Sequence, residues 1–149
     1  MFKRDITYED FNGDKVTETF YFNLTKTEVL ELEASYKGGI QAAIQKVVET
    51  RDAQGMIDNY KKIILKAYGV KSEDGKRFIK NDQVREEFTQ TPAYDILFME
   101  VATVEDAFDN FLKAVIPKDM LQELEKLEKA GNETKTLPSP PTTMSTESK

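Results

Sequence analysis

At the start of the chain, mostly apolar or aromatic side chains alternate with polar ones. The alternation has a period of two residues, which is the period of a β-strand. Residues 16–22 are rich in β-branched and aromatic side chains, which favour strands. Between the two runs, Asn12 and Gly13 form the dipeptide that most favours a tight hairpin turn. The pattern predicts a β-hairpin over about residues 2–23. The residues on one side of the first strand are Phe2, Arg4, Ile6 and Tyr8.

After the hairpin the apolar positions follow the 3.6-residue period of an α-helix. Thr25 followed by Glu28 is a capping box, which predicts a helix from there to about Tyr36. We therefore predict a mainly α fold, in which the N-terminal β-hairpin is followed by a compact bundle of about six short helices. The further helical stretches lie over about residues 40–51, 52–68, 81–88, 91–101, 103–115 and 118–129.

Several start and stop signals divide these helices. Asp52 and Asn81 are predicted N-caps, and Thr91 followed by Pro92 is a predicted helix start. Gly69 is expected to stop the helix over 52–68. The stretch 91–101 is apolar on most sides, which predicts central burial. Thr103 and Asp106 are expected to open the next helix as a capping box. Residues 72–75 form a turn, with Gly75 at positive φ and Phe78 as the apolar anchor after it.

The composition changes at residue 131. Residues 131–149 hold three of the five prolines and two large apolar side chains, Leu137 and Met144. Such a segment does not bury enough apolar surface to offset the entropy of ordering. We expect residues 1–130 to be a single helical domain and residues 131–149 to be a disordered Pro/Ser/Thr-rich tail.

The residue types argue against catalysis. The chain has no Cys and no His, so it lacks thiolates, the commonest general base and the commonest metal ligands. Neighbouring Glu86 and Glu87 point to different helix faces, and Glu105 and Asp109 lie in a predicted first turn, where acids favour the helix dipole. We expect no catalytic residue, no bound metal and no cofactor.

Charge and hydropathy narrow the partners. The net charge of −6 argues against nucleic acid as the main partner, because phosphate binding needs clustered Lys and Arg. No apolar run reaches the length of a membrane span, and residues 1–10 lack an apolar signal region. We expect no nucleic-acid or membrane partner and a cytoplasmic protein.

Three segments are candidate contact surfaces. Three consecutive aromatic residues on a strand cannot all face one side, so either a partner covers one face of the hairpin or Tyr21 stays half exposed. The charged loop is either a solvated turn or a protein contact surface, and the last helix is either a docking helix or a short coiled-coil seam. The candidate residues are Phe20, Tyr21 and Phe22 in the hairpin; Lys71, Glu73, Asp74, Gly75, Lys76 and Arg77 in the loop; and Met120, Leu121, Leu124 and Leu127 in the last helix.

A set of positions between about residues 20 and 117 resembles a known family, the tail assembly chaperones of long-tailed siphophages that infect Gram-positive bacteria. The loop at Lys71–Lys80 is the best-matched segment. The other matching positions are Tyr21 to Thr25 with Glu28, Leu30 and Leu32; Gly38, Gly39 and Ile40; Ile63 to Lys66 with Tyr68 and Gly69; and Phe88, Thr91, Ala93, Tyr94, Leu97, Phe98 and Met99.

The resemblance implies a mostly helical protein of the host cytoplasm that binds the phage tape measure protein, keeps it soluble, and is absent from the finished virion. In many members the family also has a longer form made by ribosomal frameshifting that recruits the tail tube protein; this chain would be the short form. The homo-oligomer is predicted from the hairpin instead, because its aromatic residues put apolar groups on both faces and its two unpaired edges allow the sheet to continue into a second copy. The alternative is a structural component of the virion, such as a minor tail protein or a head–tail connector, which would pair by its hairpin edge.

Overall fold

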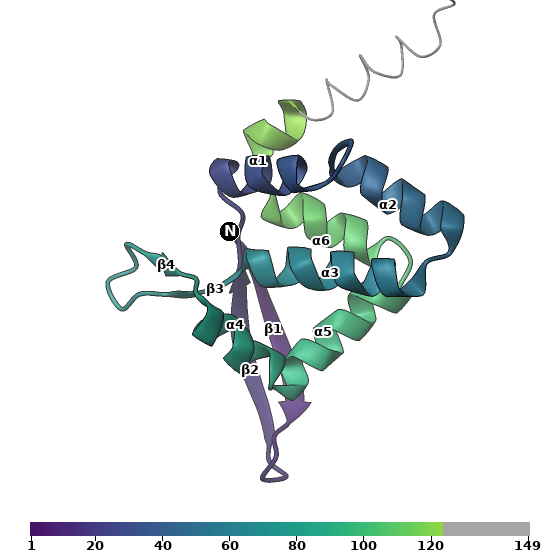
Figure 1. The fold of residues 1–149 in the computed structure, drawn as a ribbon. Coiled ribbons are helices and arrows are strands. Elements are labelled where there is room, and N and C mark those ends of the chain that lie inside the picture. The colour runs from purple at the N-terminus through teal and green to yellow at the C-terminus, as the bar shows by residue number, and fades with distance from the viewer. Residues whose placement is uncertain (124–149) are drawn as a thin grey trace, which may run out of the picture. The chain divides into compact units, whose positions relative to one another are not determined.

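The computed structural model describes residues 1–123 and confirms the mainly α fold with an N-terminal β-hairpin (Figure 1). Residues 1–117 form one compact unit, and the chain from Lys118 onward is a separate unit, of which residues 118–123 are described and helical. The elements of the first unit are β1 (Phe2–Glu9), β2 (Lys15–Phe22), α1 (Lys26–Ser35), α2 (Gly39–Thr50), α3 (Ala53–Ala67), β3 (Tyr68–Lys71), β4 (Phe78–Ile79), α4 (Asp82–Thr89), α5 (Pro92–Thr103) and α6 (Ala107–Val115).

The predicted hairpin forms with all eight residues of β1 paired to β2, from Phe2 opposite Phe22 to Glu9 opposite Lys15. The Asp10 carboxylate closes the turn by accepting hydrogen bonds from two backbone amides, each at 2.9 Å. The predicted alternation holds, because Ile6 is buried while Lys3, Asp5, Thr7 and Glu9 are exposed. One face of the hairpin therefore meets the helices and the other is polar.

A second hairpin, β3–β4, extends the sheet in the order β1-β2-β3-β4 and projects away from the helices in Figure 1. Its presence corrects the expectation that Gly69 is a helix stop, because α3 ends at Ala67 and Gly69 pairs with Tyr21 inside the sheet. A Cβ at Gly69 would lie 2.6 Å from the Phe78 ring. Glycine is therefore required here by the close approach of a side chain.

Most helices begin where a side-chain cap was predicted. The capping box of α1 is complete, and the three further caps each accept a hydrogen bond from a backbone amide three residues on. The capping box expected at Thr103 and Asp106 is wrong: the Thr103 hydroxyl ends α5 by donating to the Met99 carbonyl, and Asp106, at φ 65°, makes no side-chain cap. The confirmed caps are Thr25, Asp52, Asn81 and Thr91.

The core is a cluster of aromatic rings around Phe22, which is fully buried. Its ring packs against Phe2 of β1, Tyr68 of β3, Phe88 of α4 and Phe111 of α6, with centroid distances between 5.4 and 6.1 Å. Edge-to-face and tilted contacts of this kind add to the free energy gained by burying each ring. One side chain thus joins two strands and two helices to β2.

Helix α5 lies at the edge of this core, which corrects the expectation of central burial. Only Ala93, Leu97 and Val101 are buried, whereas Ile96 and Met99 are 42% and 51% exposed. An apolar composition predicts burial on most sides, but this helix packs along a single stripe, Ala93, Leu97 and Val101. Ile96 and Met99 are therefore on the surface, whereas Tyr94 and Phe98 are half-buried.

We predict that Phe22→Ala destabilises the protein by about 3–5 kcal/mol, because it removes a fully buried ring and leaves a cavity. The control is Phe11→Ala in the β1–β2 turn, where the ring is 87% exposed. That change should alter the free energy of unfolding by less than about 0.5 kcal/mol. Urea denaturation measures both, and equal effects would contradict the central place given to Phe22.

Candidate interaction surfaces

The first question for the described residues is whether they gather metal-binding side chains. Among residues 1–123, no group of three or more His, Cys, Asp or Glu side chains is placed to hold a metal ion. Within the same part of the chain, no helix has the length and apolar character that crossing a membrane requires. The features that remain for function are surfaces: a charged loop, an outer sheet face, a groove and several exposed apolar side chains.

The loop between β3 and β4 is held in one shape by its own polar groups. The Asp74 carboxylate accepts hydrogen bonds from the Ser72 hydroxyl at 2.7 Å and the Lys76 amide at 3.0 Å. The Ser72 hydroxyl in turn accepts from the Arg77 amide at 3.0 Å. Gly75 has φ 73°, as predicted, and nothing lies within 4 Å of a Cβ there. The hydrogen bonds from Lys76 and Ser72 hold the pKa of Asp74 below its ordinary value.

The charged side chains of this loop are exposed. Lys71, Glu73, Lys76 and Arg77 are exposed, and the turn projects from the helical part of the unit (Figure 1). A pre-organised turn loses little conformational entropy when a partner binds it. The loop therefore presents charge of both signs in a fixed arrangement, which suits the rim of a protein contact.

A nearly buried ion pair fixes the base of the β3–β4 hairpin to the rest of the unit. The Lys80 ammonium donates to the Asn23 carbonyl at 2.6 Å and to both Glu28 oxygens at 2.8 and 2.9 Å. The two side chains are 10% and 19% exposed. Burial opposes ionisation of Glu28, but the bonds from Lys80 and Thr25 outweigh it and lower its pKa. Burial lowers the pKa of Lys80 more than Glu28 raises it.

The structure separates the three aromatic residues of β2. Phe20 and Phe22 are 8% and 0% exposed and belong to the core, so neither offers a contact surface. Tyr21 is on the opposite, outer face of the sheet and half-buried. The Lys71 ammonium lies 4.4 Å from the centre of the Tyr21 ring, a cation–π contact. The outer sheet face and the charged loop, two candidate surfaces in the sequence, therefore meet at this pair.

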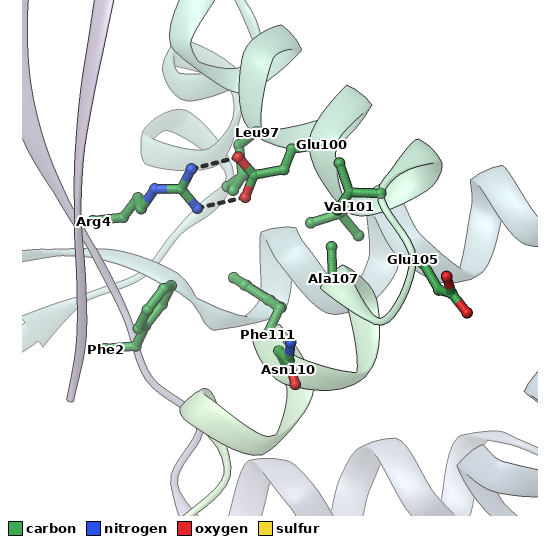
Figure 2. Close-up of a pocket in the computed structure, with 10 residues that line it drawn as sticks. Phe2, Arg4, Leu97, Glu100, Val101, Glu105, Ala107, Asn110 and Phe111 are labelled. Atoms are coloured by element: carbon green, nitrogen blue, oxygen red, sulfur yellow. Dashed lines mark hydrogen bonds and ion pairs between the residues drawn. The ribbon is translucent and has the colours of Figure 1, made fainter.

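A groove opens between β1 and helices α5 and α6 (Figure 2). Its volume is about 270 Å3, and its walls are mostly apolar, with Phe2, Leu97, Val101 and Phe111 among them. Above these side chains, the Arg4 guanidinium binds the Glu100 carboxylate through two parallel hydrogen bonds of 2.7 and 2.5 Å. The hydrogen bond from Arg4 lowers the pKa of Glu100. The pair ties strand β1 to α5 beside the groove.

Several exposed apolar side chains were not singled out in the sequence. Ile96 and Met99 lie one turn apart on α5, and Val104, 55% exposed, follows that helix and lines the groove. Phe11 is 87% exposed at the tip of the first hairpin. A signal for Phe11 was available, since an aromatic residue next to the Asn12–Gly13 turn cannot reach the core. No such signal was available for the exposed α5 residues, because a sequence that is apolar on most sides of a helix predicts a buried helix.

The candidate residues of the last helix are only partly described. Met120 and Leu121 lie in the helical residues 118–123. Leu124 and Leu127 lie outside the described residues, as does the expected boundary at 130 and the segment 131–149. The docking helix or short coiled-coil seam expected here extends beyond the described residues.

Comparison with known proteins identifies one family. A family model described as phage tail assembly chaperone matches residues 1–149. No curated protein and no solved structure gives a significant match.

We predict that Lys80→Met destabilises the protein by about 3 kcal/mol at pH 7, because it leaves the Glu28 carboxylate nearly buried without its partner. The loss should shrink as the pH falls to about 3. Glu28 has a lowered pKa in the folded chain, so its favourable contribution is present above the ordinary value of 4.5 and disappears as the carboxyl is protonated. Denaturant unfolding at several pH values measures this dependence.

The matched control is Lys66→Met. The Lys66 ammonium also meets a glutamate, Glu31 at 3.2 Å, but that glutamate is 59% exposed. An exposed pair of this kind contributes about 0–1 kcal/mol. A loss in Lys80→Met that equals the loss in Lys66→Met, or that stays constant from pH 7 to about pH 3, would remove the structural role given to the buried pair.

Proposed function

The chain belongs to the phage tail assembly chaperone family, and from this premise we propose that it binds the tape measure protein of its phage and keeps it soluble until tail tube subunits surround it. The match of the family model over residues 1–149 carries the proposal. The Gram-positive siphophage origin, which the sequence resemblance implied, is part of the same proposal. The activity proposed is binding without turnover, so the chain needs no catalytic residue and no cofactor.

The α5 surface, defined here as Ile96 and Met99, is the proposed centre of the tape measure contact. A long helical protein exposes apolar stripes before it is enclosed, and such stripes bind best to apolar side chains on a rigid support. Ile96 and Met99 project from a helix whose opposite side is anchored by buried Leu97 and Val101. Methionine adapts to partners of different shape, which suits repeated binding along one partner.

The charged loop is the proposed rim of this or a neighbouring contact. Its exposed Lys71, Glu73, Lys76 and Arg77 supply charges of both signs, and Tyr21 beside Lys71 adds an aromatic ring. Met120, Leu121, Leu124 and Leu127 of the last predicted helix form a further proposed contact. The net charge of −6 would keep a chain-covered tape measure protein soluble through mutual repulsion.

The remaining parts of the proposal concern assembly. We propose that the chain works in the host cytoplasm as a homo-oligomer and is released before the virion is complete. A longer form made by frameshifting would bring in the tail tube protein. The location, the release and the longer form are what the family resemblance implies, and the homo-oligomer is what the unpaired edges of the hairpin predict.

The direct test is co-expression of the chain with the tape measure protein encoded by the same phage. We expect the soluble fraction of the tape measure protein to rise several-fold and the two proteins to purify together. Ile96→Glu combined with Met99→Glu should abolish both effects, because two carboxylates would have to be desolvated at the centre of the contact. The control is Val48→Glu on α2, where the side chain is 57% exposed.

Val48→Glu should keep the tape measure protein soluble, and circular dichroism should show unchanged helical content in all variants. A tape measure protein equally soluble with and without the chain, and no recovered complex, would contradict the chaperone proposal and favour a structural tail component. Retained binding in the double α5 variant would move the contact to the loop or the last helix.

A further inference from the structure

The outer edge of β1 is an open hydrogen-bonding edge with a regular order of groups. Among the described strands, β1 pairs with β2 and with no other. The bond of 2.8 Å from the Asp10 amide to the Asp14 carbonyl makes these two residues a hydrogen-bonded pair. Because such pairs alternate along an antiparallel ladder, the even-numbered residues of β1 bond to β2. The odd-numbered residues turn their backbone groups outward.

A bond on the far side of β2 supports this order. The Asn23 amide donates to the Ala67 carbonyl at 2.8 Å, on the side toward β3. Odd-numbered residues of β2 thus face away from β1, as the alternation requires. The outward-facing groups of β1 therefore belong to Lys3, Asp5, Thr7 and Glu9, whose side chains are all exposed on the outer face.

We propose that two copies of the chain pair antiparallel through this edge of β1, with a two-fold axis at Ile6, so that the sheet continues from one copy into the other. In this register Lys3 faces Glu9 of the second copy and Asp5 faces Thr7. Each pairing occurs twice because of the axis. Opposite charges placed directly across a ladder stabilise it. The Asp5–Thr7 pair brings no like charges together, and within each copy the Asp5 carboxylate accepts from the Thr19 hydroxyl at 2.6 Å while the Thr7 hydroxyl lies 2.8 Å from that of Thr17.

The neighbouring registers each place like charges opposite one another. A shift that centres the axis on Asp5 puts two Asp5 carboxylates face to face. A shift that centres it on Arg4 does the same with two guanidinium groups. A shift toward the turn sets Asp5 against Glu9 twice. Like charges directly opposite destabilise a ladder, so the charges of β1 select the register centred on Ile6.

The second copy would also complete the groove of Figure 2. The groove lies between β1 and helices α5 and α6, with Phe2 and Arg4 as its β1 wall, and a second copy added at the β1 edge would lie next to this wall. In the proposed register, the residue opposite Arg4 on the same face is Tyr8 of the second copy. Its ring would cover the mouth of the groove, beside the Arg4–Glu100 pair.

A charge-reversal cycle tests the pairing without the tape measure protein, so its outcome is separate from that of the proposed function. Sedimentation equilibrium should show a dimer for the full chain. Lys3→Glu or Glu9→Lys alone should raise its dissociation constant about tenfold, because each turns two attractive pairs into repulsive ones. Both changes together should restore the dissociation constant to within about threefold.

The matched control is Lys61→Glu, which makes the same charge change at an exposed position of α3. It should leave the dissociation constant unchanged. A wild-type chain that stays monomeric at high concentration would overturn the proposal. A double variant no tighter than the single variants would do the same.

Cross-linking reads the register directly, since the chain has no native cysteine. An oxidised mixture of Asp5→Cys and Thr7→Cys chains should form a mixed disulfide dimer, because residues opposite one another in a hydrogen-bonded pair have Cα atoms about 5.5 Å apart. Asp5→Cys alone should cross-link at least tenfold more slowly, since its two thiols would be diagonal neighbours. Equal yields from the mixture and from Asp5→Cys alone would overturn the register.

Discussion

The fold of residues 1–117 depends on the burial of the Phe22 ring. This one side chain contacts rings from β1, β3, α4 and α6, and it is fully buried among these elements. The neighbouring rings reinforce it, since Tyr68 and Phe88 stack at 4.0 Å. A hairpin is marginal alone in water, so the helices stabilise it, and it in turn gives the helices a common surface. The β3–β4 hairpin, held at its base by Lys80 and Glu28, and the α5 surface are supported by this arrangement.

Local signals allowed much of the fold to be predicted. The caps at Thr25, Asp52, Asn81 and Thr91, the Asn12–Gly13 turn and the positive φ of Gly75 depend on neighbours within a few residues, and the structure has all of them. The role of Gly69 could not be predicted from local sequence. The residue is a glycine because the ring of Phe78 approaches it closely, and it pairs with Tyr21 in another strand. Two-residue pairings such as β3 with β4 leave too short a pattern to recognise.

The candidate surfaces were predicted less completely, and the physical reason is burial. Three aromatic residues in β2 look alike in sequence, yet the helices cover Phe20 and Phe22 and leave Tyr21 on the outer face. Ile96 and Met99 look like core residues and are exposed, because α5 packs along one stripe only. Which apolar side chain is covered depends on elements far away in the sequence. The turn in the charged loop was easier to predict from sequence, because its hydrogen bonds are local and its charged side chains are exposed.

A tail assembly chaperone that acts through binding must hold its partner and then leave, and the surfaces described here suit such a role, with apolar side chains on a rigid helix and mixed charges on a fixed loop. Quantitative mass spectrometry of infected cells tests this account most directly, by counting copies of the chain on the soluble tape measure protein and in finished particles. The account predicts many copies per tape measure protein in the soluble complex and none in the finished particle. A chain that is absent from the complex, or that is present at fixed stoichiometry in the finished particle, would contradict it.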